Sequence, residues 1–343
     1  MARRPTIQDV ADAAQVSVAT VDRVLSGRLK VRPETARKVS EAAHRVGYHA
    51  VNLIEQRLRA DLPELRIGFV LQKMYQPFYQ SVASEIDTAV QQSAGIRGTS
   101  IIKYASSQHP EEIAELMLSM QGRVDVVAAN AVNHARVTDA VLRLRDSGVE
   151  TCALFNDFAQ GERLSYIGLN NLKAGRIAAW MLGTATQSTG KVAIFVGGQR
   201  WHGHELRETG FRSYMREARP DLTVLDTLIN QETRQLTYDS TRALLKQYSD
   251  LKGLYVAGGG MEGAIKALRE MRDPGKISLI VSELTAESRS ALADGYATMA
   301  IGTPLRQLFP DLVNLIKKHV LGPDHAVPSQ NFLEPLIYLP ESI

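Results

Sequence analysis

The sequence predicts an α/β protein in which a small all-α helix-turn-helix head precedes a two-lobed domain of doubly wound parallel sheets. Residues 6–29 have the pattern of two short helices joined by a tight turn. From Pro63 onward, short apolar strands alternate with helices, as in parallel sheets that are covered by helices on both faces. This alternation has too many units for one compact sheet, so we expect two lobes.

The first helix of the head is predicted to begin after Thr6. Thr6 stands at the N-cap position, and Asp9 follows three residues later, which is close to a capping-box pattern. Apolar residues then recur at helical spacing and give the helix one apolar face. These residues are Ile7, Val10, Ala11 and Ala14.

The second helix is predicted over residues 18–25, with Ser17 as its N-cap. Its apolar residues Val21, Val24 and Leu25 would pack on the first helix. The residues left facing outward are Val18, Ala19, Asp22 and Arg23. A second helix of this size can enter the major groove of DNA, although two short helices also occur in any small helical bundle.

The spacing of the head's residues decides between these two interpretations. The pattern D-V-A-x-x-A-x-V-S-x-x-T-V-x-R-V-L begins at Asp9, and it is followed by V-R-P-E-T-A-R-K-V from Val31 and by Gly47-Tyr48. This combination closely resembles the DNA-binding head of LacI/GalR-family transcription regulators. The resemblance covers residues 1–48 and implies a DNA-binding domain there.

The resemblance implies which residues contact DNA. Val18, Ala19 and Arg23 are expected to touch base edges, and Asp22 to orient Arg23 or to disfavour some bases. The backbone contacts are expected from Ser17 and Thr20, and from residues near the turns and caps. The remaining predicted DNA-binding residues are Thr6, Arg28, Lys30 and Arg32.

Charge is distributed unevenly along the chain. Residues 1–60 contain 11 Lys and Arg against 6 Asp and Glu, a net charge of +5. Because the whole chain carries +3, residues 61–343 carry −2. A basic head on a nearly neutral remainder suits phosphate contact by one end of the protein.

A third helix is predicted over residues 33–46, and residues 49–62 are predicted to be a hinge or linker. The resembled family has a Pro-Asn pair at the start of this linker and a leucine that wedges into the minor groove. Here Ala50 and Val51 replace the pair, and Leu58 lies one residue beyond the expected wedge position. Leu58 is therefore either a displaced wedge or part of a plain connector.

The remainder, residues 63–343, is predicted to bind an effector and to dimerise. Strands are predicted at residues 66–71, 100–104, 124–129, 151–155, 191–196, 223–228, 253–256, 278–281 and 297–300. Helices are predicted at residues 78–93, 110–120, 135–147, 171–182, 203–217, 234–247, 261–271, 287–293 and 304–318. Two consecutive lobes would change over near residues 157–165.

This region resembles the periplasmic sugar-binding-protein fold that the same regulator family uses. The resemblance runs over residues 65–321. It is carried by Pro77-Phe78-Tyr79 after the first strand, by Tyr166-Ile167-Gly168-Leu169-Asn170-Asn171, and by Arg207 followed by Gly210-Phe211. It implies a small polar effector, such as a sugar, a polyol or a sugar acid, in a cleft between the lobes.

Ligands bind outside the carboxyl ends of the strands in such sheets, so we take the residues just after strands as candidates. The predicted effector-binding residues are Gln72, Tyr75, Phe78, Tyr79, Asn130, Asn156, Asp157, Arg207, Gly258 and Glu283. Glu232 is a further candidate. Asp157 has an alternative role in capping the lobe crossover, and Arg207 has one in a surface ion pair with Glu205 or Glu208.

Gly258-Gly259-Gly260 stands where the relatives carry an Asn-Asp pair. The glycines are expected to remove polar side chains and to open space. Their backbone N–H groups suit a phosphate, but no P-loop lysine follows them.

No enzymatic, metal or membrane function is predicted. The sequence has no Gly-x-Ser-x-Gly, His-Glu-x-x-His or Walker A pattern, and His202 and His204 are badly spaced for a metal site on one helix face. They are expected on a loop at the rim of the cleft. Cys152, the one cysteine, has no partner for a disulfide, and no apolar run reaches the length of a membrane span.

The sequence therefore predicts a cytoplasmic transcription regulator, usually a repressor in the resembled family, that needs no cofactor. Its expected partners are double-stranded operator DNA, a small-molecule effector and a second copy of the chain. The alternative function is that of a cytosolic sugar-binding protein without regulatory DNA binding, and the basic head counts against it.

Overall fold

The computed structural model describes residues 4–27, 31–54, 62–323 and 325–343. Arg28, Lys30 and Leu58, which the sequence assigns to DNA contact, lie outside these residues. The chain divides into two compact units, Met1–Leu65 with Gln91–Thr99, and Arg66–Val90 with Ser100–Ile343. None of the described helices is long and apolar enough to cross a bilayer.

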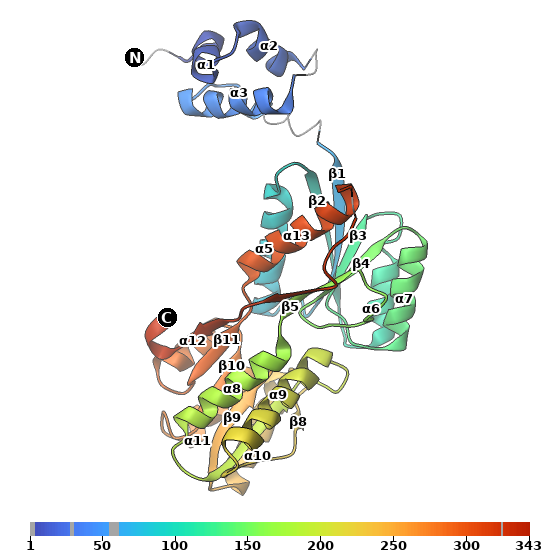
Figure 1. Ribbon diagram of the computed structural model, residues 1–343. Coiled ribbons are helices and arrows are strands. Elements are labelled where there is room, and N and C mark those ends of the chain that lie inside the picture. The colour runs from blue at the N-terminus through green and yellow to red at the C-terminus, as the bar shows by residue number, and fades with distance from the viewer. Residues whose placement is uncertain (1–3, 28–30, 55–61, 324) are drawn as a thin grey trace. The chain divides into compact units, whose positions relative to one another are not determined.

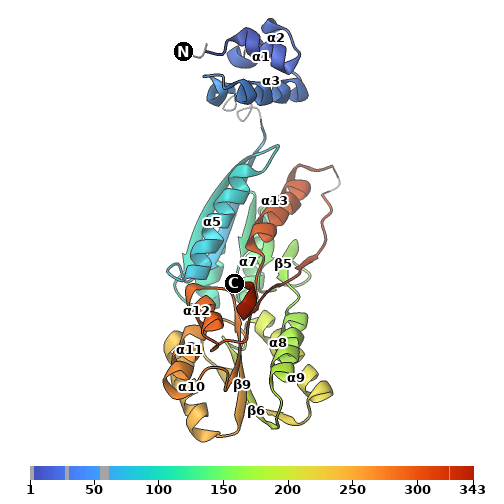
Figure 2. The ribbon, with the colours of Figure 1, turned by 90° about the vertical axis from the view of Figure 1, so that its left-hand side faces the viewer.

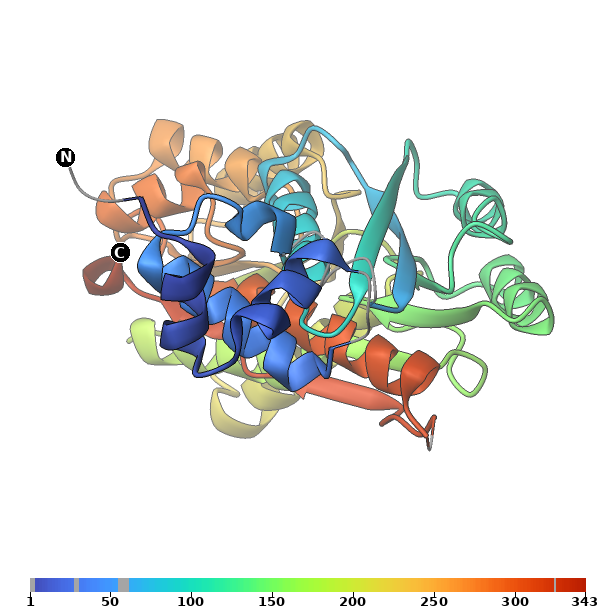
Figure 3. The ribbon, with the colours of Figure 1, turned by 90° about the horizontal axis from the view of Figure 1, so that it is seen from above.

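The head has the three predicted helices, α1 (Ile7–Ala14), α2 (Val18–Ser26) and α3 (Pro33–Val46), which pack on one another (Figure 3). The capping box at α1 is confirmed. The Thr6 backbone N–H donates to the Asp9 carboxylate at 2.7 Å, and the Asp9 N–H donates to the Thr6 hydroxyl at 3.3 Å. Ser17 caps α2 by accepting the Thr20 N–H at 3.2 Å.

The core of the head forms where the apolar faces of the three helices meet. Val10, Val21 and Val39 are fully buried, and Tyr48 belongs to the same core. Ile54 joins the same core from a short helical turn at residues 51–54. The beginning of the predicted linker is therefore packed against the head.

The first lobe is a six-stranded sheet in the order β12-β5-β4-β3-β1-β2. Its strands are β1 (Glu64–Gln72), β2 (Arg97–Ala105), β3 (Val126–Ala129), β4 (Glu150–Leu154), β5 (Ser165–Leu169) and β12 (Gln330–Leu333). Helices α5 (Pro77–Gln92) and α13 (Leu305–Leu321) cover one face, and α6 (Pro110–Leu118) and α7 (Ala135–Asp146) cover the other (Figure 1).

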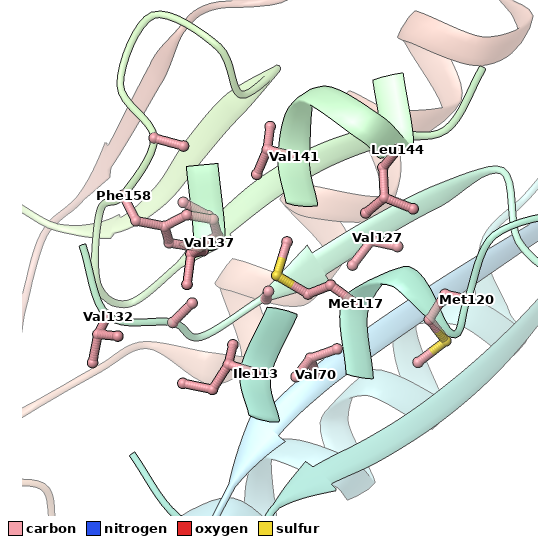
Figure 4. Packing of buried hydrophobic residues seen from close by; sticks show 14 of the residues in the cluster. Val70, Ile113, Met117, Met120, Val127, Val132, Val137, Val141, Leu144 and Phe158 are labelled. Carbon is pink, nitrogen blue, oxygen red and sulfur yellow. The ribbon is translucent and has the colours of Figure 1, made fainter. Parts of the chain in front are cut away.

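Aliphatic side chains fill the layer between this sheet and helices α6 and α7. Met117 of α6 and Val141 of α7 point toward Val70 and Val127 of the sheet (Figure 4). All four are essentially excluded from solvent. Burying a side chain of this size contributes about 1.5–3 kcal/mol, so the layer holds the carboxyl ends of β1 and β3 in fixed positions.

The second lobe repeats this architecture in the order β13-β11-β10-β9-β6-β7, with β8 paired to β6. Its strands are β6 (Gly190–Val196), β7 (Leu222–Val224), β8 (Leu228–Ile229), β9 (Leu251–Val256), β10 (Ser278–Ser282), β11 (Met299–Gly302) and β13 (Leu336–Tyr338). One face carries α8 (Asn171–Ala185) and α9 (His202–Ala218). The other carries α10 (Arg234–Gln247), α11 (Met261–Met271) and α12 (Ala286–Ala293) (Figure 2).

The predicted order of two consecutive lobes is wrong. The chain first crosses after β5, later than predicted, and then returns through α13 and β12 to the first lobe before β13 rejoins the second. The sequence did not reveal β12 and β13 because both are edge strands of only four and three residues that are largely exposed. The predicted strand at 223–228 is likewise two short strands, β7 and β8.

Candidate functional site

A cavity of about 120 Å³ lies between the two lobes, at the carboxyl ends of strands from both sheets. A single water molecule needs roughly 10–15 Å³ of such a cavity, so this cavity has room for a molecule the size of a monosaccharide. Its first-lobe lining consists of Gln76, Pro77, Phe78, Tyr79, Asn130, Phe155 and Asn156. Its second-lobe lining consists of Asn171, Trp201, Gly203, His204, Arg207, Glu232, Gly258, Gly259, Gly260, Met261, Glu262, Ser282, Glu283, Thr285 and Thr303.

Aromatic rings form one wall of the cavity. The ring centroid of Phe78 lies 5.2 Å from that of Tyr79 and 5.5 Å from that of Phe155. Trp201 lies in the loop before α9, and its indole N–H donates to Gln108 of the first lobe at 3.0 Å. Ring faces at this position suit the C–H faces of a sugar.

Arg207 lies in α9 with its guanidinium group in the cavity wall. Its Nε donates to Asn171 Oδ1 at 2.7 Å, and its Nη1 donates to the Ala257 carbonyl at 2.6 Å and to the Ser282 hydroxyl at 3.2 Å. The alternative of a surface ion pair is wrong, because Glu208 pairs with Arg212 and Glu205 lies beside His202.

Two glycines allow α9 to bring Arg207 this close to α8. A Cβ atom at Gly175 of α8 would lie 2.0 Å from the Arg207 carbonyl oxygen. A Cβ atom at Gly210 of α9 would lie 2.1 Å from the Leu172 carbonyl oxygen. Since the obstacles are backbone atoms, a larger residue at either position requires the helices to separate.

Glu283 follows β10 and has a left-handed backbone with φ of 69°. Its carboxylate accepts the Thr303 hydroxyl at 2.6 Å and the Thr303 backbone N–H at 2.9 Å. Burial raises the pKa of the Glu283 carboxyl, although these hydrogen bonds and the charge of Arg207 act in the opposite direction.

His204 and Glu232 occupy the space beside the three-glycine segment. A Cβ atom at Gly258 would lie 2.7 Å from the His204 ring and 3.0 Å from Glu232 Oε1. The expectation that these glycines open empty space is therefore wrong, because other polar side chains fill it. His204 lies in the first turn of α9 and not on a loop at the rim.

His204 is held in one neutral form. The Gly197 N–H donates to its Nδ1 at 3.0 Å, so in the neutral ring the proton is on Nε2. Burial lowers the pKa of His204 from 6.5 to about 4, despite the opposing charge of Glu232, whose carboxylate lies 3.8 Å from Nε2.

Glu232 joins the two lobes by an ion pair. Lys73, just after β1, donates from its Nζ to the Glu232 carboxylate and to the Glu232 carbonyl, both at 3.1 Å. Burial acts to raise the pKa of Glu232, but the Lys73 charge, with smaller effects from its other partners, holds it below the ordinary value. A second link between the lobes runs from the Gly203 N–H to Asn156 Oδ1 at 2.7 Å.

Seven of the ten predicted effector-binding residues line the cavity. They are Phe78, Tyr79, Asn130, Asn156, Arg207, Gly258 and Glu283. Gln72, Tyr75 and Asp157 lie outside it. The Gln72 amide is buried and donates to the Asn130 carbonyl at 3.3 Å, Tyr75 is 87% exposed, and Asp157 forms a buried ion pair with Arg163 at 2.5 Å.

Sequence reasoning missed several lining residues. Phe155 directly follows β4 and precedes Asn156, so the rule of choosing residues just after strands applies to it as well. Asn171 and Trp201 begin or precede helices, so that rule did not reach them. In the sequence, His204 stands out only beside His202, in a pair badly spaced for a metal site. The fold is needed to show that His204 lines the cavity.

The outward face of α2 is as the sequence predicts. Val18, Ala19, Asp22 and Arg23 are exposed, whereas Val21 and Val24 are buried against the other helices. The hydroxyls of Ser17 and Thr20 lie 2.9 Å apart at the start of α2. Arg32 is exposed before α3, and the Thr6 hydroxyl donates to Asp9 at 2.7 Å. The first turn of α2 thus presents short side chains, and its last turn presents Arg23.

The described part of the chain includes no group of three or more His, Cys, Asp and Glu side chains placed to hold a metal ion. Burial raises the pKa of the Cys152 thiol to about 12.

Comparison with known proteins gives two family matches. Residues 67–324 match the model of the periplasmic binding protein domain, and residues 6–50 match that of bacterial regulatory proteins of the lacI family. The chain is 27% identical over 294 residues to the HTH-type transcriptional regulator CelR of Thermobifida fusca, which covers 80% of this chain and 79% of that protein. It is 32% identical over 118 residues to catabolite control protein A of Priestia megaterium, covering 34% of each.

Solved structures support the same fold for the larger region. The chain superposes on a periplasmic solute-binding protein of Actinobacillus succinogenes, solved with bound D-allose, with a TM-score of 0.73. The two are 18% identical, and the match covers 81% of this chain and 98% of the other. At this identity the likeness shows the fold alone.

Proposed function

The chain belongs to the LacI family of bacterial regulatory proteins, and from this premise we propose that it is a DNA-binding transcription regulator gated by a small polyhydroxylated effector. One observation carries the proposal. The same chain holds a helix-turn-helix whose second helix exposes Val18, Ala19, Asp22 and Arg23, and a cavity between two lobes that is lined by polar and aromatic groups. Neither feature alone requires the other, but a ligand-gated regulator needs both.

In this proposal residues 1–48 read DNA, residues 49–62 connect, and residues 63–343 bind the effector and dimerise. Val18, Ala19 and Arg23 contact base edges, and the N-terminal groups of α2 contact phosphates. Asp22 sits beside Arg23 and orients it or rejects some bases. The protein acts where chromosomal DNA is accessible, in the bacterial cytoplasm.

The effector acts through the two lobes. A ligand in the cavity contacts Phe78 and Tyr79 of the first lobe and Arg207 and Glu283 of the second. Such a ligand favours the arrangement in which both lobes touch it, by the difference in contact free energy alone. The cavity volume of about 120 Å³ supports a ligand of monosaccharide size. An enzymatic role has no support among the regulators and binding proteins that resemble the chain.

The first test measures operator binding as a function of salt. A protein that neutralises Z phosphates shows a log–log slope of about −0.9Z, so we expect a steep fall in affinity with salt for the full chain. Arg23→Ala should lose about 1–3 kcal/mol of discrimination between operator and mutated operator, because Arg23 is placed to contact guanine O6 and N7.

Arg216→Ala, an exposed position in α9, is the matched control and should behave as the wild type. Affinity that stays flat with salt would contradict DNA binding. Full binding of a sugar with no binding to the chain's own promoter region would favour the sugar-binding alternative. Unchanged operator preference in Arg23→Ala would show that Arg23 does not read bases.

The second test concerns assembly. One helix-turn-helix buries too little surface for tight specific binding, and symmetric regulators read two half-sites, so we expect a homodimer formed by residues 63–343. Helices α5 and α6 are the proposed first-lobe interface. Light scattering of the full chain at micromolar concentration should give twice the chain mass of 37.8 kDa. A monomer mass there would count against the dimer.

A further inference from the structure

We propose that the cavity selects an uncharged polyhydroxylated effector over sugar acids and sugar phosphates, with Glu232 and His204 as the specificity-determining residues. The inference rests on the proposed function, because it concerns the effector of the same cavity. It narrows the effector from the wider set of sugars, polyols and sugar acids that the sequence allows.

Acidic side chains outnumber basic ones in the lining of the cavity. Among the described lining residues, Arg207 is the only lysine or arginine. Three carboxyl groups line the cavity, those of Glu232, Glu262 and Glu283. Arg207 already directs two of its nitrogens to Asn171, Ala257 and Ser282. A ligand anion would therefore enter a site in which negative groups outnumber positive ones.

The two basic groups beside the cavity, Lys73 and His204, do not offset this negative charge. The Lys73 ammonium is bonded to the Glu232 carboxylate at 3.1 Å, and His204 is neutral because burial lowers its pKa. The excess of negative charge is felt inside the cavity. Burial first, and the charges of Glu232 and Glu283 in addition, hold the pKa of Tyr79 well above its ordinary value.

The hydrogen-bonding groups of the lining suit hydroxyl groups. The carboxylates of Glu232 and Glu283 line the cavity, and their oxygens keep lone pairs beyond those that accept from Lys73 and Thr303, so they can accept hydrogen bonds from a ligand. The His204 Nε2–H supplies a donor to a ligand oxygen. Hydroxyl groups meet both requirements because each donates one hydrogen bond and accepts others.

The glycines explain why these two residues can act here. The absence of side chains at Gly197 and Gly258 leaves room for the His204 ring and for Glu232, whose atoms would lie within 3.1 Å of added Cβ atoms. Gly258 and Gly259 bring no side chain to the cavity, and a histidine and a carboxylate from other segments occupy the space beside them. Their chemistry, and not that of the glycines, sets the ligand preference.

The test compares matched ligands on the full-length chain by isothermal titration. The uncharged probes are D-glucose, D-allose, D-xylose, D-galactose and ribitol. The anionic probes are D-gluconate, D-glucuronate, D-galacturonate and D-glucose 6-phosphate. We expect at least one uncharged probe to bind, and each anion to bind at least tenfold more weakly than that probe. Binding led by an anion, or no binding by any uncharged probe, overturns the proposal.

A variant tests whether Glu232 sets this preference. Glu232→Gln keeps the shape of the side chain but removes its charge and leaves the Lys73 ammonium without its carboxylate partner. We expect the ratio of uncharged to anionic affinity to fall at least tenfold. Glu208→Gln, in which a carboxylate that pairs with Arg212 outside the cavity is changed, should keep the wild-type ratio. Equal ratios in the two variants would overturn the role of Glu232.

Thermal unfolding of both variants shows whether they fold. If Glu232→Gln does not fold, His204→Gln provides the second measurement. We expect His204→Gln to bind the uncharged probe at least tenfold more weakly than the wild type does. Unchanged affinity overturns the proposal. Operator binding is measured separately. If the chain binds operator DNA but prefers anionic ligands, the proposed function stands and this inference is wrong. If the chain prefers uncharged sugars but does not bind operator DNA, this inference stands and the regulatory function is wrong.

Discussion

Replacing Gly175 with alanine is expected to destabilise residues 63–343 by up to about 2 kcal/mol and to abolish the effector response. The added Cβ atom would lie 2.0 Å from the Arg207 carbonyl oxygen, a backbone atom that can move only with α9. Overpacking of this kind costs typically about 1–3 kcal/mol, and the higher helix propensity of alanine offsets about 1 kcal/mol of it. The helices relieve the overlap by separating. Separation displaces Arg207 and His204 from the cavity together.

The measurement is urea unfolding, together with titration of whichever probe sugar the wild type binds. Gly183→Ala, in the same helix, is the matched control. There the nearest atom to an added Cβ is a side-chain carbon of Arg219 at 3.0 Å, which can shift without moving a helix. Stability and effector affinity should stay close to the wild type in Gly183→Ala. Wild-type behaviour of Gly175→Ala would mean that α8 and α9 tolerate separation and that the site does not depend on their close contact.

Lowering the pH from 7 to 5 is expected to cost the protein about 2 kcal/mol of unfolding free energy through His204 alone. The pKa of His204 is about 4 in the folded protein and 6.5 without burial. Between these values the unfolded chain binds a proton that the folded chain does not, so stability falls as the pH falls. The loss reaches about 3 kcal/mol when the pH has fallen to the folded pKa.

His204→Gln removes this group, so the difference in stability between wild type and variant should shrink as the pH falls from 7 to 5. Taking the difference cancels the contribution of Glu283, which both proteins share. His109→Gln, an exposed histidine before α6, should keep the wild-type slope. Parallel pH profiles for wild type and His204→Gln would show that His204 is not held neutral by the fold.

The head could be predicted from the sequence because its structure is set by residues close together in the chain. Thr6 and Asp9 satisfy each other's backbone and side-chain groups within one turn, and Ser17 does the same for α2. The apolar spacing of Val10, Val21 and Val24 then leaves the outward face of α2 determined. The same local logic predicts most strands and helices of residues 63–343, because each is an apolar run or an apolar stripe of adequate length.

Tertiary structure decided which residues meet in the cavity. Phe78, Asn130, Arg207 and Glu283 follow strand ends or lie in a recognisable motif, so the sequence placed them there. Gln72 and Asp157 satisfied the same rule but found partners elsewhere, in the Asn130 carbonyl and in Arg163. A rule based on strand ends cannot register such partners, because they come from other parts of the chain.

Glu232 and His204 show the limit most clearly. They lie 28 positions apart in the sequence, yet both pack over Gly258, where the chain itself offers no side chain. The sequence determined that polar groups were missing at residues 258 and 259. Which side chains occupy that space was decided by two tertiary features. One is the close approach of α9 to α8, which Gly175 and Gly210 allow, and the other is the turn before α10. Those are contacts between distant segments, whose free energy depends on packing and burial and leaves no periodic signal in the sequence.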